Sequence, residues 1–164
     1  MTKAANRLYG INVMSAAVDH CEGRDFSGRL YTLYDREPRQ FHSVMDLIQQ
    51  MDSQFDLWDY PQSASIDRSF RGNRNQTDAS TMPQERELEH EFRRQRLPDY
   101  ASGLKQYDLL EHPGRIGTYI IKVKFRQNAT WQGQVHLVER DRIEAFNSVL
   151  ELVKILDADL YEAL

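Results

Sequence analysis

The segment WQGQVHLVERDRIEAFNSVLELVKILD (Trp131–Asp157) decides the fold, because the earlier segment FSGRLYTLYDREPRQFHSVMDLIQQMD (Phe26–Asp52) aligns with it without a gap. The offset is 105 residues, and 6 of the 27 aligned positions are identical, Gly28 with Gly133 among them. We interpret the two segments as copies of one unit. The alternative is that two unrelated strand-to-helix units follow the same patterning rules.

Each copy predicts two strands, a hairpin and a helix. The first strand of the second copy alternates between two sets of residues, as a strand with one buried face does. The inward set is Tyr119, Ile121, Val123 and Phe125, and the outward set is Ile120, Lys122, Lys124 and Arg126. In the second strand the residues on the buried side are Trp131, Gly133, Val135 and Leu137. We therefore expect the Trp131 ring to lie in the core.

Serine residues mark the start of the helix in both copies. Ser43 with Asp46, and Ser148 with Glu151, have the Ser-x-x-acid spacing of a capping box. Apolar residues then recur at helical spacing. Because a unit of about 45 residues is only marginally stable by itself, we expect the two units to pair.

These patterns predict an α+β fold in which tandem duplicated β-β-β-α units form a pseudo-twofold antiparallel sheet covered by two helices. The first unit is expected at residues 1–60 and the second at residues 111–164. Residues 61–110 are expected to be a polar linker that carries a charged helix at about 82–97, which Pro98 ends. The three regions together should make one domain.

Composition argues against several classes of protein. The 164 residues carry a formal net charge of −4, so the chain as a whole does not attract nucleic acid or anionic membrane. Cys21 is the only cysteine, which rules out an internal disulfide and fits a reducing compartment. The N-terminal residues include no apolar run long enough for a signal peptide or a membrane span. We therefore expect a cytoplasmic protein without a membrane partner.

Two motifs resemble those of a known protein family. The residues that carry the resemblance are Pro61, Gln62, Ser65, Arg68, Ser69 and Phe70, followed by FRQNATWQG at Phe125–Gly133. This combination resembles a family of small, uncharacterised bacterial proteins with a C-terminal Phe-Arg-Gln-Asn-Ala-Ser/Thr-Trp-Gln-Gly motif. The family has no known activity, so the resemblance implies a type of bacterial protein and no mechanism.

The FRQNATWQG turn is the sharpest candidate for a binding site. Arg126, Gln127 and Asn128 would present hydrogen-bond donors beside Trp131. In the structural alternative, Asn128 suits a turn, Trp131 fills the core, and Gly133 permits close approach of the backbone. The apolar part of the motif has counterparts in the first copy and the polar part has none, so any function should belong to the polar part.

Basic residues form two further candidate surfaces. One face of the strand should present Lys122, Lys124 and Arg126, which could contact a nucleic-acid backbone; a solvated sheet face is the alternative. The linker adds a second set, Arg68, Arg71 and Arg74. For this set a charged tether is the alternative. No histidine has a partner at metal-ligand spacing, so no metal or other cofactor is expected.

We expect a non-enzymatic binding or adaptor protein with a protein partner. The first alternative is a nucleic-acid-binding protein that uses the basic sheet face and the linker arginines. The second alternative is an enzyme that the motifs do not reveal. The sequence leaves the ligand and the oligomeric state open.

Overall fold

The structure is a computed structural model that describes residues 8–62, 96–126 and 130–163. Five of the candidate binding residues lie outside these ranges: Arg68, Arg71, Arg74, Gln127 and Asn128. Almost all of the charged helix expected at 82–97 lies outside them too.

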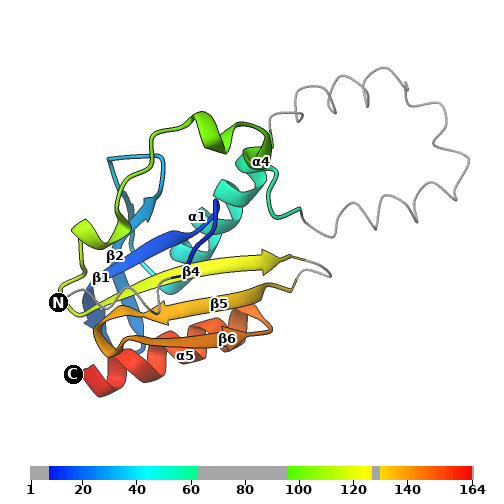
Figure 1. The fold of residues 1–164 in the computed structure, drawn as a ribbon. Helices are drawn as coiled ribbons and strands as arrows, with labels where there is room; N and C mark the ends of the chain where they lie inside the picture. Colours follow the sequence, from blue (N-terminus) through cyan, green and yellow to red (C-terminus); the bar gives the residue numbers. More distant parts are fainter. Residues whose placement is uncertain (1–7, 63–95, 127–129, 164) are drawn as a thin grey trace, which may run out of the picture.

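The fold is α+β, built on one six-stranded antiparallel sheet with the strand order β3-β2-β1-β4-β5-β6 (Figure 1). The first half of the molecule (residues 8–62) contains β1 (Met14–Glu22), β2 (Asp25–Thr32), β3 (Arg39–Phe41) and α1 (Val44–Trp58). The second half (residues 117–163) contains β4 (Gly117–Phe125), β5 (Gln132–Leu137), β6 (Arg142–Phe146) and α5 (Val149–Ala163). Because β1 and β4 pair at the centre, each half supplies one side of the sheet.

The pairing register of the two halves is the same after a shift of 105 residues. The matching pairs are Met14–Thr32 with Tyr119–Leu137, and Gly28–Phe41 with Gly133–Phe146. A register shift follows Val18 in β1 and recurs after Val123 in β4. At the centre of the sheet Ser15 pairs with Ile120, which stands 105 positions later. A twofold axis between these two residues would exchange the halves.

Close approach of neighbouring strands explains why both halves have glycine at the same position. A Cβ atom on Gly28 would lie 2.0 Å from the carbonyl oxygen of Ala17, and one on Gly133 would lie 1.9 Å from that of Lys122. No side chain fits at such a distance from backbone. The two glycines therefore permit the same contact beside the same bulge.

Both predicted capping boxes are present. The Ser43 hydroxyl accepts a hydrogen bond from Asp46 N (3.0 Å), and the Asp46 carboxylate accepts one from His42 N (2.9 Å). At the start of α5, Ser148 accepts from Glu151 N (3.0 Å) in the same way. These bonds satisfy backbone N–H groups that the first helical turn leaves without partners.

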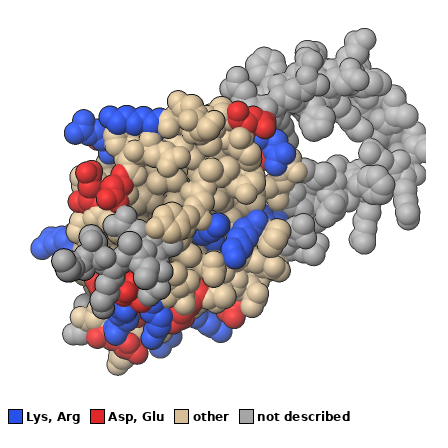
Figure 2. Space-filling model, viewed as in Figure 1, with Lys and Arg blue, Asp and Glu red and all other residues tan. Residues whose placement is uncertain are grey.

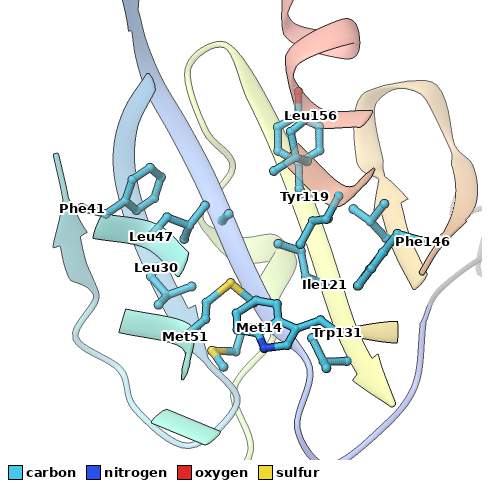
Figure 3. Close-up of a cluster of buried hydrophobic side chains, with 14 of the residues drawn as sticks. Met14, Leu30, Phe41, Leu47, Met51, Tyr119, Ile121, Trp131, Phe146 and Leu156 are labelled. Atoms are coloured by element: carbon cyan, nitrogen blue, oxygen red, sulfur yellow. The ribbon is translucent and has the colours of Figure 1, made fainter. Parts of the chain in front are cut away.

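The main core lies between the sheet and the two long helices, on what we term the helix face of the sheet. Figure 3 shows Met14 and Ile121 pointing into it from the strands, Trp131 from just before β5, and Leu47 and Leu156 meeting them from α1 and α5. The Trp131 ring is 4% exposed and packs edge-on against Phe55 at 5.5 Å between ring centroids. The prediction that Trp131 belongs to the core is confirmed.

The opposite face of the sheet, the cover face, holds a second apolar cluster. Residues 104–116, which we term the cover segment, cross this face and place Leu109 over it. The strands contribute Ala17, Tyr31 and Ile120 to the cluster, and Val13 joins it from just before β1. The expectation of a sheet with one apolar face was wrong, because the region read as a polar linker returns to the sheet and buries part of its second side.

The first half of the molecule holds the cover segment in place. Arg29 forms a bidentate pair with Asp19 (2.8 and 3.1 Å) and also donates to the carbonyl of Pro113 (3.1 Å). The Asp19 carboxylate accepts a further bond from Arg115 N at 3.1 Å. The ring of His112 stacks on Tyr31, with 5.0 Å between the centroids.

The chain enters the cover segment through the short helix α4 (Leu97–Tyr100). Pro98 stands in the first turn of α4. Proline suits a first turn, where no N–H donor is needed; the predicted end of the charged helix at Pro98 is not tested, because residues 82–95 lie outside the described ranges. The 3₁₀ turns η3 (Ala101–Gly103), η4 (Leu109–Glu111) and η6 (Val138–Arg140) complete the described elements.

Candidate functional site

A cavity of about 340 Å³ lies between the cover face and the segments that cross it, and we term it the sheet cavity. Its floor is formed by side chains of the sheet and of the segments that flank it: Val13, Leu33, Ile120 and His136. Its walls are formed by Leu8, Tyr9, Gln106, Tyr107, Asp108, Leu109 and Leu110. The volume is within the range of small-molecule sites, which runs from about 300 to 1,000 Å³.

Most of the lining is apolar, and His136 is its most deeply buried polar side chain. His136 is 4% exposed, and its Nε2 lies 3.3 Å from the Asp141 carboxylate. With Nε2–H donating to that carboxylate, Nδ1 of the neutral ring is an acceptor. Nδ1 is buried and has no hydrogen-bond partner among the described residues. A buried acceptor without a partner costs free energy, so this nitrogen calls for a physical explanation.

Two lysines follow Ile120 along β4 on the cover face. Lys122 pairs across the strands with Gln134, and its ammonium group donates to the carbonyl of Tyr9 at 2.6 Å. Tyr9 also lines the sheet cavity, so the Lys122 ammonium lies next to a residue of the cavity wall, although Lys122 itself is not a lining residue. Lys124 is exposed to solvent. Figure 2 shows Lys and Arg atoms set within a surface of mainly uncharged residues at the centre of this view.

Arg126 does not share the face of Lys122 and Lys124, so that part of the predicted basic surface was wrong. The register shift between Val123 and Phe125 adds one residue to β4, and a bulge of this kind changes the side on which the following residues lie. Phe125 is therefore 53% exposed and Arg126 only 3% exposed. The strand prediction assigned these two residues the other way round.

The buried guanidinium of Arg126 binds α1 and the segment after it. Its Nε donates to the carbonyl of Pro61 at 2.6 Å, and its Nη1 donates to Asp52 (2.9 Å) and Asp56 (3.0 Å). The group also lies over the Phe55 ring, 5.3 Å from the centroid. Arg126 belongs to the FRQNATWQG motif and Pro61 to the other motif of the family resemblance, so this hydrogen bond joins the two motifs in a structural contact.

A second buried polar network joins the sheet to α5. Tyr119 donates to the Asp159 carboxylate at 2.7 Å, and Asp159 also binds Arg140. Burial raises the pKa of Tyr119, and the hydrogen bond to Asp159 raises it further. Since every member of the network has a partner, it serves the fold and leaves no group available for chemistry.

The sequence analysis did not predict the sheet cavity as a site, although one signal was present. Val13, Leu33 and Ile120 are apolar residues at positions that the alternation assigns to the outward face. Their presence there indicates that the second face is also covered. His136 is the polar residue that the sequence analysis missed, because it was read as one of several hydrogen-bonding groups on an exposed surface.

Comparisons with known proteins add no assignment: no family model, no curated protein and no solved structure matches this chain. Among the described residues, no group of three or more His, Cys, Asp or Glu side chains could hold a metal ion. In the same part of the chain, no helix has the length and apolar character needed to cross a membrane. The resemblance to the bacterial family remains a prediction.

Proposed function

We propose that the protein is a binding protein that holds a small, mainly apolar ligand in the sheet cavity. The observation that carries the proposal is the cavity itself, with its mainly apolar lining. A ligand that fills the space would remove the lining from water, at roughly 25 cal/mol per Å² of apolar surface.

The hydrogen bonds already made by the titratable groups around the cavity favour binding over catalysis. The Nε2 of His136 is engaged by Asp141. The carboxylate of Asp108 accepts a hydrogen bond from Leu110 N at 2.9 Å, which caps the turn η4. Neither group is set against a nucleophile in the described lining, and a ligand held without chemistry is the simpler use of such a site.

The two halves, in this proposal, arose by tandem duplication of one β-β-β-α unit. The common register, the bulge and the paired glycines support this origin. The halves then diverged on the cover face. His136 stands 105 positions after Tyr31. The ring of His112, from the cover segment, stacks on the ring of Tyr31. Among the described residues, no such ring covers His136, which lines the sheet cavity.

A thermal-shift screen of small organic compounds against the full chain tests the proposal. A compound that binds only the folded protein raises the free energy of unfolding by mass action, by about 2.7 kcal/mol at a hundredfold excess over Kd. The midpoint temperature of unfolding rises as a result. Leu33→Trp places a large ring in the cavity and should abolish the shift. Leu57→Trp is the matched control, because Leu57 is 70% exposed on α1, away from the cavity.

The proposal fails if no compound raises the midpoint, or if the compounds found stabilise Leu33→Trp as much as the unchanged protein. Should Leu33→Trp not fold, Leu8→Trp fills the same cavity from the N-terminal side and serves in its place. Salt-dependent binding of random RNA or DNA would instead favour the nucleic-acid alternative. The expected protein partner and the cytoplasmic location stay predictions.

A further inference from the structure

The strongest difference between the halves lies at the residues that follow the bulge. In the first half, Asp19 and Arg29 form a bidentate ion pair that neutralises both charges. The residues 105 positions later are Lys124 and Gln134. The second half therefore has a cation where the first has a carboxylate, and an amide where the first has the balancing guanidinium.

The positive charge on this part of the second half is not neutralised within the described chain. Lys122 pairs across the strands with Gln134, and neither Lys122 nor Lys124 has a described carboxylate within ion-pair distance. The bond from Lys122 to the carbonyl of Tyr9 uses one of three ammonium donors. The other two donors have no partner among the described residues, and the ammonium lies beside Tyr9, a residue of the cavity wall.

We propose that the ligand of the sheet cavity is a small organic anion. This inference rests on the proposed function. The apolar body lies against Val13, Leu33 and Ile120, and the anionic group binds the Lys122 ammonium, with Lys124 adding to the local positive field.

Charge on the walls sets the orientation of the ligand. Asp108 belongs to the cover segment and lines the cavity with its carboxylate, which repels an anion. Lys122 belongs to the sheet and attracts one. The anionic group is therefore directed toward Lys122 and away from Asp108. A hydrogen bond to a charged group contributes about 1.5–3 kcal/mol, enough for at least a tenfold preference.

Isothermal titration of the full chain with octanoate and with 1-octanol separates the two proposals. The pair shares an alkyl chain and differs in the carboxylate. We expect octanoate to bind at least tenfold more tightly than 1-octanol, with the preference shrinking as salt is added. Lys122→Met should weaken octanoate about tenfold and leave 1-octanol unchanged, and Lys122→Arg should restore most of the loss.

Lys154→Met is the matched control, because Lys154 is an exposed lysine on α5. It removes the same charge and should change neither affinity. If neither probe binds, the proposed function itself is contradicted. Equal binding of the two probes leaves the cavity as a binding site and overturns the anion proposal. An octanoate preference that is unchanged in Lys122→Met also overturns the anion proposal. If the methionine variant does not fold, Lys122→Gln is used for the same test.

Discussion

The first and second halves of this protein have one framework and two different cover faces. Strand pairing, bulge position, capping serines and the close-approach glycines agree after the shift of 105 residues. On the cover face the first half presents Asp19, Arg29 and Tyr31, which bind the chain's own cover segment. The second half presents Lys124, Gln134 and His136 at the same positions. The comparison separates residues that build the unit from residues that decide what it holds.

The largest effect should come from the framework glycines. Gly28→Ala and Gly133→Ala each place a Cβ atom about 2 Å from a carbonyl oxygen, so we expect each to lower the free energy of unfolding by about 3 kcal/mol or more. Similar losses in urea denaturation would support a common framework. Gly103→Ala is the control, since nothing lies within 4 Å of its Cβ position; a loss at only one of the two glycines would break the comparison.

Arg126→Ala should give the next largest effect. The change leaves the carbonyl of Pro61 without its donor in a buried position, and we expect a loss of about 2 kcal/mol in the free energy of unfolding. Asp52 and Asp56 are exposed and return to water, which limits the cost. Lys124→Ala, two residues earlier and exposed, should change stability by less than about 0.5 kcal/mol. Equal effects of the two changes would contradict the buried position of Arg126.

Arg29→Gln puts the residue of the second half into the first and should loosen the cover segment. The bonds to Asp19, Tyr31 and Pro113 are lost together. Because Arg29 is about a quarter exposed, we expect a loss of only about 1 kcal/mol. Amide exchange at residues 104–116 should accelerate more than exchange in β5. Unchanged protection of the cover segment would show that other contacts hold it.

Lowering the pH should have the smallest effect on the cover segment, and only below about pH 4. Burial raises the pKa of Asp19, but hydrogen bonds from the Arg29 side chain and the Arg115 amide outweigh it, so the net pKa lies below the ordinary 3.8. A carboxyl group whose pKa is lower in the folded than in the unfolded protein stabilises the fold at pH values above its unfolded pKa. That contribution is lost as the pH falls through its folded pKa. Exchange of the cover segment should therefore be constant from pH 7 to about 4, after correction for intrinsic rates. Asp19→Asn should remove the change below that.

Much of the framework could be predicted from the sequence, because it depends on short-range signals. The serine caps at 43 and 148, the helical periodicity and the strand around Ile121 were all read correctly. The Val123 bulge was not, since a bulge leaves the composition of a strand unchanged and is set by pairing with the next strand. That one extra residue exchanged the environments of Phe125 and Arg126.

The candidate site could not be predicted, because it depends on a contact between distant segments. Residues 104–116 have no periodicity that links them to a sheet, and only the fold shows Leu109 covering Ile120. His136 looked like one of several polar residues on an exposed strand. Its burial follows from the cover segment, so no local pattern around position 136 could have indicated it.

Xenon binding in solution tests the central claim most directly, namely that the cover face has an open apolar cavity beside His136, whereas the cover segment fills the corresponding position at Tyr31. Xenon enters apolar cavities without needing a specific ligand. Under xenon pressure, we expect the largest amide shift changes at Val13, Leu33, Ile120 and His136, which line the cavity. Tyr31, covered by His112, should change little. Equal changes at Tyr31 and at His136, or none at the residues that line the cavity, would contradict the account.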